Sequence, residues 1–132
     1  MTELMGRAGE ILHTVTPSDL ATHWNNDIPV LATPILLWLS ELAAMRALED
    51  LLPTTAMTLG IAHDSRHLAP TPLGFTISVS ARVKAVTGKY VTFDVKATDG
   101  FEVILSGTHT RAIIEREKFE ERVADKSTGA RP

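Results

Sequence analysis

Hydrophobic and polar residues alternate along residues 75–84, which is the pattern of a β-strand with one buried face. The apolar face of this strand holds Phe75, Ile77, Val79, Ala81 and Val83. Four more strands are predicted where apolar runs are bounded by turn residues, at residues 10–15, 55–63, 90–98 and 101–114. The pattern therefore predicts an antiparallel meander that is apolar on one face.

A single long helix is predicted at residues 34–52, where apolar side chains cover nearly the whole circumference. Thr33 is suited to the N-cap and Pro34 to the first helical position, and Pro53 ends the segment. A sheet wrapped around this helix would bury both apolar surfaces. The expected fold class is thus α+β, with a long central helix wrapped by a curved antiparallel sheet of about five strands.

Glu41 is an acidic side chain in the most apolar stretch of the chain, residues 34–45, where Ser40 is the only other polar residue. The residues three and four positions away are Leu37, Trp38, Ala44 and Met45. Because none of them is a cation, the pattern predicts a raised pKa for the Glu41 carboxyl group, as in groups used for acid/base catalysis. The alternative is that Glu41 faces a wet gap or a subunit boundary and meets an ordinary hydrogen-bond partner.

The 132 residues are enough for one domain, expected at residues 1–124, with a flexible C-terminal tail at residues 125–132. The formal net charge is −3 and basic residues are interleaved with acidic ones, which does not indicate binding to nucleic acid or to an anionic membrane. There is no cysteine, so disulfides and thiolate catalysis are excluded. No signal peptide or membrane span is recognised, and a cytoplasmic location is expected.

Among the five histidines, His67 is the strongest candidate for chemistry because it lies between a predicted strand and a proline-rich turn. A surface histidine is the alternative interpretation. His63 and His67 would lie ~13 Å apart on a strand, too far to share a metal ion, and no metal site is predicted. Thr33 offers a hydroxyl at a helix start, where backbone N–H groups favour negative charge, although a simple N-cap explains it equally well.

Three segments, ATPILLWLSELAAM, TLGIAHDSRHLAPTPLG and SGTHTRAIIEREKF, resemble the hotdog-fold acyl-CoA thioesterases, in particular the branch that includes fluoroacetyl-CoA thioesterase. The resemblance implies a hotdog fold and a catalytic group formed by Thr33, Glu41 and His67, with Gly60 in the substrate-binding position. It also implies an acyl-CoA substrate and no cofactor, since CoA is part of the substrate. The expected assembly is a homodimer, with a tetramer as the larger alternative.

The chain departs from the fluoroacetyl-specific members before the threonine, where they carry a longer segment with aromatic residues. Here only HWNNDIPVLA precedes Thr33, and Trp24 is its sole aromatic residue. The resemblance therefore implies hydrolysis of a small or medium acyl-CoA and leaves the acyl group open. Leu31, Leu36 and Trp38 are candidates for shaping the acyl pocket.

The spacing raises a geometric difficulty, because a regular helix would hold the Thr33 and Glu41 backbones ~12 Å apart. Either the first residues after Thr33 fold back, or residues from two chains form one site. Two other functions stay open: a hotdog dehydratase or hydratase, and a non-catalytic module that binds acyl-CoA or another small ligand.

Overall fold

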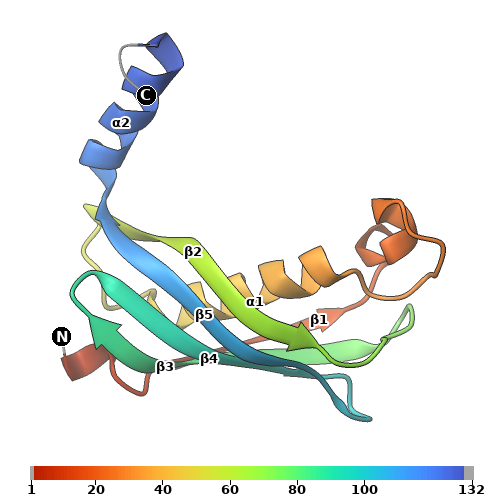
Figure 1. Cartoon of the computed structure of the whole chain (residues 1–132). Coiled ribbons are helices and arrows are strands. Elements are labelled where there is room, and N and C mark those ends of the chain that lie inside the picture. The colour runs from red at the N-terminus through yellow and green to blue at the C-terminus, as the bar shows by residue number, and fades with distance from the viewer. Residues whose placement is uncertain (1, 130–132) are drawn as a thin grey trace.

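The structure, a computed structural model describing residues 2–129, is built on one antiparallel sheet with strand order β1-β3-β4-β5-β2 (Figure 1). The strands are β1 (Ala8–Thr14), β2 (Ala56–His67), β3 (Thr76–Thr87), β4 (Tyr90–Thr98) and β5 (Val103–Glu115). The helices are α1 (Thr33–Leu48), α2 (Arg116–Thr128) and three short 3₁₀ helices, η1 (Thr2–Leu4), η2 (Pro17–Asp19) and η3 (Ala21–Trp24). The predicted α+β class, with five strands and a central helix, is confirmed.

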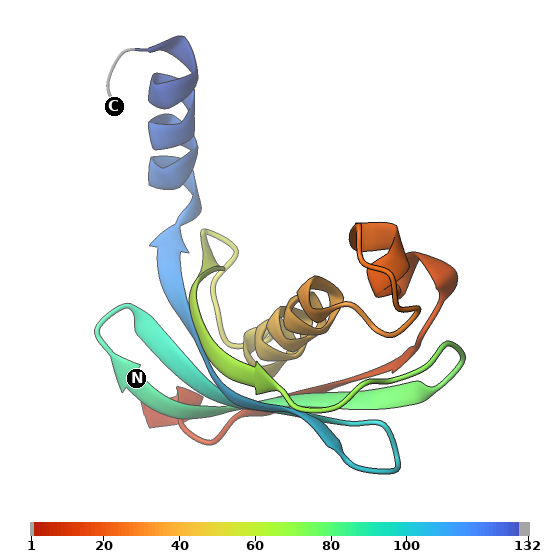
Figure 2. The ribbon, with the colours of Figure 1, turned by 45° about the vertical axis from the view of Figure 1, so that its right-hand side comes forward.

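Helix α1 lies across the concave face of the curved sheet, as Figure 2 shows. Its fully buried residues include Leu36, Leu39 and Ala43, and they join Phe93 of β4 and other strand residues in one hydrophobic core. Gly9 of β1 lets this helix approach the sheet closely. A Cβ atom there would lie 2.2 Å from the Ala43 backbone oxygen, so a larger residue would push α1 away. The distance between α1, which carries Glu41, and the sheet therefore depends on Gly9, a residue far from Glu41 in sequence.

Strand predictions agree with the structure best where turns bound the element. The meander of β3, β4 and β5 is confirmed, and the predicted bounds of β4 agree with the observed ones. Strand β2 is longer than predicted and continues to His67, which is paired with Leu105 of β5. Strand β2 pairs with β5 along its whole length, from Ala56 with Glu115 to His67 with Leu105. No pattern within β2 alone indicates that the strand extends this far.

Helix α1 differs from the prediction at both ends. Ala32 occupies the N-cap position and Thr33 is the first helical residue, so the N-cap prediction for Thr33 is wrong. The helix stops at Leu48, four residues before the predicted end. Leu51 and Leu52 instead pack against the core from the turn that follows, which lets the chain reverse before Pro53.

The C-terminal helix α2 projects away from the sheet in Figure 1, and Phe119 and Val123 are exposed on it. This helix follows β5 directly and reaches Thr128. Of the predicted flexible tail, residues 125–128 belong to α2, whereas residues 130–132 lie outside the described residues. No helix in residues 2–129 is both long enough and apolar enough to cross a membrane.

Candidate active site

Thr33 and His67 form a hydrogen-bonded pair between the start of α1 and the end of β2. The Thr33 Oγ1 atom lies 2.7 Å from His67 Nδ1. Since Ala32 provides the cap position, the Thr33 hydroxyl is bonded to the imidazole and has no capping bond. A hydroxyl next to an imidazole is the arrangement of a nucleophile and its general base.

The surroundings of His67 keep its ring neutral. Burial lowers the pKa of the His67 imidazole, and a backbone contact with Ala69 offsets this only in part. Its Nε2 atom is buried and has no hydrogen-bond partner among the described residues. A neutral imidazole beside the Thr33 hydroxyl can accept a proton near neutral pH.

The Thr33–His67 pair borders an open cavity of about 480 Å³. The lining mixes η3, the loop before α1 and the segment after β2: Ala21, Trp24, Asn26, Val30, Leu31, Ala32, Thr33, Pro34, His67, Leu68, Ala69 and Pro70. Of the three residues expected to shape an acyl pocket, Leu31 lines this cavity. Leu36 is fully buried in the core and Trp38 is not among the lining residues.

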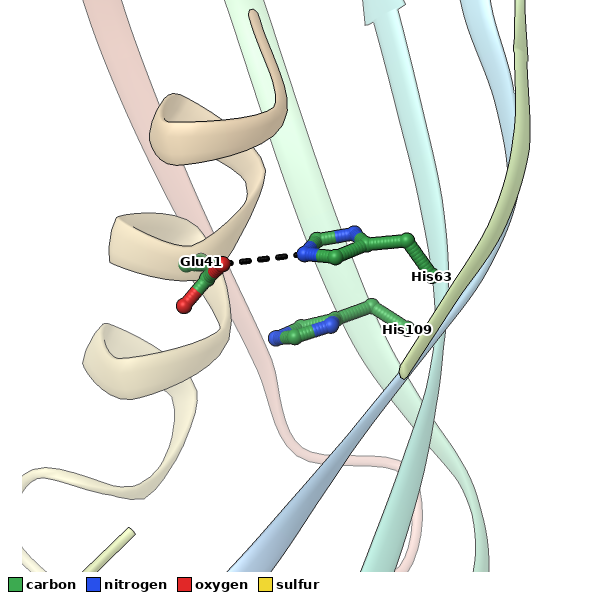
Figure 3. Close-up of side chains that lie close together, drawn as sticks. All are labelled: Glu41, His63 and His109. Atoms are coloured by element: carbon green, nitrogen blue, oxygen red, sulfur yellow. Dashed lines mark hydrogen bonds and ion pairs between the residues drawn. The ribbon is translucent and has the colours of Figure 1, made fainter. Parts of the chain in front are cut away.

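Glu41 occupies a second cluster, in which both of its carboxylate oxygens have partners on the sheet. His63 Nε2 lies 2.9 Å from Glu41 Oε2 (Figure 3), and Arg111 Nη1 lies 3.0 Å from Glu41 Oε1. The Glu41 side chain is 32% exposed, whereas that of Arg111 is 3% exposed. The carboxylate thus reaches from α1 to two donors, on β2 and β5.

The raised pKa predicted for Glu41 is wrong. Burial would raise the pKa of this carboxyl group, but hydrogen bonds from His63 and Arg111, together with the Arg111 charge, outweigh burial and lower it. Glu41 is therefore ionised at neutral pH and is a weaker base than an ordinary glutamate. The prediction failed because it examined cations at helical spacing, whereas the cation comes from β5.

His109 completes the cluster as a neutral, buried ring that stacks on His63, as Figure 3 shows. Burial and the neighbouring His63 and Arg111 lower the pKa of His109 to about 4. Its Nδ1–H donates to the Ala62 carbonyl over 2.9 Å, so its Nε2 accepts from Arg111 Nη1 over 3.1 Å.

Ligand atoms of Glu41, His63 and His109 lie within 4.8 Å of one another, a spacing that could hold a metal ion. The Arg111 guanidinium already occupies this position and donates hydrogen bonds to both Glu41 and His109. Arg111 is itself held by Thr58, through the hydroxyl at 2.8 Å and the carbonyl at 3.0 Å. A divalent cation would have to displace the buried Arg111 guanidinium from the hydrogen bonds that it already donates. Glu41, His63 and His109 therefore do not suit a metal.

Gly60 provides the space that Glu41 occupies. A Cβ atom at this position would lie 2.7 Å from Glu41 Oε1 and 3.1 Å from His109 Cε1. The β2–β5 register also shifts between Gly60 and Ala62, which bends the strand at this point. Gly60, predicted to bind substrate, therefore lies directly against the candidate acid.

Replacement of Gly60 by alanine is expected to push the Glu41 carboxylate off Arg111 and lower kcat about tenfold, because small misplacements of catalytic groups are costly. The fold should persist, since the group that must move is the end of a flexible side chain. Free-CoA release and a thermal melt check this. Unchanged kcat in a folded Gly60→Ala protein would contradict it.

The three predicted catalytic residues are not brought together within one chain. Thr33 and His67 form one cluster, and Glu41 forms another with residues that sequence reasoning had not assigned to the site. Helix α1 is continuous from Thr33, so the expectation that its first residues fold back is wrong. Arg111 belongs to the second cluster, since it is 2% exposed and bonded to Glu41.

Comparison with known proteins agrees with this fold. The profile of the fluoroacetyl-CoA-specific thioesterase family, FlK, matches residues 15–117. The fluoroacetyl-CoA thioesterase of Streptantibioticus cattleyicolor is 40% identical over 98 residues, covering 74% of this chain and 70% of that protein. A solved structure of the fluoroacetyl-CoA thioesterase FlK superposes with a TM-score of 0.87 at 33% identity, covering 92% of this chain and 96% of that one.

A hot-dog-like protein from Thermanaerovibrio acidaminovorans superposes with a TM-score of 0.87 at 24% identity, covering 95% of each chain, which supports the fold alone. The sheet and the central helix, together with this similarity, define a hotdog-fold thioesterase, a hydrolase of acyl-CoA thioesters. The chain belongs to the fluoroacetyl-CoA-specific thioesterase family. The predicted fold and class of activity are confirmed.

Proposed function

We propose that this protein hydrolyses the thioester of a small or medium acyl-CoA, using Thr33, His67 and Glu41 in a homodimer. The observation that carries the proposal is the 2.7 Å hydrogen bond between the Thr33 hydroxyl and a neutral His67, at the edge of an open cavity of about 480 Å³. The hydroxyl and the base are both within reach of a thioester carbonyl placed in that cavity.

The proposed reaction adds water across the thioester and releases a carboxylic acid and the CoA thiol. His67 accepts a proton from the Thr33 hydroxyl or from a water bound to it, and the oxygen attacks the carbonyl carbon. The C–S bond then breaks, and the CoA sulfur takes the proton from His67. If Thr33 is the attacking group, a water activated in the same way then hydrolyses the acyl–Thr33 ester. Backbone N–H groups near the start of α1 are suited to hold the carbonyl oxygen as negative charge develops. Ionised Glu41 orients the attacking water or stabilises the His67 imidazolium. No cofactor takes part, since CoA enters as part of the substrate.

A homodimer is proposed because one chain separates Glu41 from the other two groups. On a regular helix the Thr33 and Glu41 backbones are ~12 Å apart. Trp38 and Met45, three and four residues from Glu41, are 50% and 37% exposed, which leaves an apolar surface around the acid. Ile61 on the edge strand β2 is 55% exposed. A second copy covering these residues would place its own Thr33 and His67 near this Glu41.

The dehydratase or hydratase alternative gives Thr33 no role. The Thr33 hydroxyl is instead bonded to the candidate base, which favours hydrolysis. A non-catalytic ligand-binding module would have no need of this pair.

The acyl specificity is tested by measuring free-CoA release from acetyl-, fluoroacetyl-, butyryl-, hexanoyl-, benzoyl- and phenylacetyl-CoA. Turnover of at least one short or medium acyl-CoA is expected, and the order of kcat/KM across the panel identifies the acyl group. If the folded protein releases no CoA from any of these substrates, the proposed hydrolysis is overturned in favour of a non-catalytic binding module.

Thr33→Ala is expected to lower kcat about 100-fold and Thr33→Ser to retain most of it, because both proposed roles of Thr33 need its hydroxyl. Thr92→Ala is the matched control, since Thr92 bonds only another threonine hydroxyl on the neighbouring strand. A covalent acyl adduct on Thr33→Ser in intact-mass spectra would identify residue 33 as the nucleophile. Full activity of Thr33→Ala would remove Thr33 from the mechanism.

A further inference from the structure

His63 belongs to the Glu41 cluster and lies on β2, four residues before His67, where it contacts Glu41 directly. Its Nε2 is 2.9 Å from Glu41 Oε2, and its ring stacks on His109 with centroids 4.1 Å apart and planes inclined by 14°. The side chain is 23% exposed. A bond on one side and a ring on the other hold His63 in a defined orientation.

The bond to Glu41 determines where the proton of His63 lies. An ionised carboxylate only accepts hydrogen bonds, so the Nε2 atom of His63 carries the hydrogen. The other ring nitrogen, Nδ1, then bears a lone pair when His63 is neutral. No hydrogen bond to this atom is found in the described part of the chain. The orientation of Glu41 therefore depends on one ring nitrogen of His63, Nε2.

Three charged or titratable groups face His63: Glu41 from α1, and His109 and Arg111 from β5. His109 stays neutral above about pH 4, and Arg111 is always a cation. His63 and Arg111 each bond one oxygen of the Glu41 carboxylate, so the loss of either donor would free that oxygen to turn.

We propose that His63 is a positioning residue of the thioesterase reaction: its Nε2–H holds the Glu41 carboxylate in its working orientation. This proposal rests on the proposed function, because it needs Glu41 to act in hydrolysis. His63 itself touches no reacting atom in this scheme.

The test uses two substitutions in the full chain. His63→Gln keeps an N–H donor at a similar reach, whereas His63→Leu removes the donor. His13→Gln is the matched control, because His13 Nε2 forms a similar pair with Asp19 Oδ2 at 2.7 Å, away from Glu41.

His63→Leu is expected to lower kcat about 10- to 100-fold with little change in KM, since the acid is misplaced and the cavity is untouched. His63→Gln is expected to recover most of this loss, because its amide N–H can replace the imidazole N–H as a donor to Glu41. Carbon-13 NMR of the Glu41 carboxyl group provides a readout beyond activity. The midpoint of its titration should move to higher pH in His63→Leu and stay at the wild-type value in His13→Gln.

Wild-type kcat and an unshifted Glu41 titration in a folded His63→Leu protein would overturn the proposal. If Glu41→Gln is inactive while His63→Leu behaves like the wild type, the proposed function remains supported. Absence of turnover by the wild-type protein with every acyl-CoA of the panel would overturn both the proposed function and the role of His63.

Discussion

Replacement of Glu41 by glutamine is expected to lower kcat for acyl-CoA hydrolysis by about 100- to 10,000-fold, the range found when a group acting in acid/base catalysis is lost. Glutamine keeps nearly the same shape, and its carbonyl oxygen can still accept from Arg111. The variant should therefore stay folded, so that the loss reports on the carboxylate charge. Free-CoA release and a thermal melt are the measurements.

Glu49→Gln is the matched control, because Glu49 is an exposed acid immediately after α1. Its activity should equal that of the wild type. A Glu41→Gln protein with wild-type kcat would contradict a catalytic role. A fall in melting temperature without any activity to lose would instead indicate a structural Glu41.

The same variant shows which chain supplies each group. If a site combines Thr33 and His67 of one protomer with Glu41 of its partner, mixing inactive Thr33→Ala and Glu41→Gln dimers restores one intact site in every mixed dimer. Random exchange should then recover about a quarter of wild-type activity. No recovery after verified subunit exchange would mean that each chain forms its own site.

Replacement of Arg111 by methionine is expected to reduce the free energy of unfolding by about 3 kcal/mol, because it leaves buried partners without their donor. Arg111 donates to Thr58 Oγ1, the Thr58 carbonyl, Glu41 and His109. The estimate lies at the lower end for a broken buried pair, since Glu41 is 32% exposed and water can reach it. Urea denaturation at neutral pH measures the difference.

Arg82→Met is the control for this substitution. Arg82 donates to the Gly6 carbonyl from an exposed position, so its loss should change the free energy of unfolding by no more than about 0.5 kcal/mol. Arg111→Lys should also be destabilised, because an ammonium group cannot reproduce the planar fork of bonds. A loss below about 1 kcal/mol for Arg111→Met would show that the cluster contributes little to the fold.

Local patterns in the sequence were sufficient for most elements of the fold. Alternation with a period of two and glycine-containing turns located β3, β4 and β5, because these signals depend on neighbouring residues. Element ends were less predictable. Helix α1 stops at Leu48 since Leu51 and Leu52 find burial outside the helix, and β2 reaches His67 since β5 offers partners along its whole length.

The candidate site was only partly accessible from the sequence. Thr33 and His67, 34 residues apart, were singled out by their positions in the chain and given a joint role by the resemblance to a family. The structure places Thr33 Oγ1 2.7 Å from His67 Nδ1. Glu41 was singled out by its apolar surroundings along the helix. Its partners His63 and Arg111 were missed, because they lie on β2 and β5 and no pattern along α1 reveals them.

The sequence by itself determined the class of fold and the residues that could take part in chemistry, because periodicity and motifs are local properties of a chain. The tertiary structure alone decided the state of Glu41. The sheet brings Arg111, 70 residues away, to the carboxylate, and this contact changes an expected raised pKa into a lowered one. The charge state of a partly buried group depends on what surrounds it in space, and only the folded chain defines those neighbours.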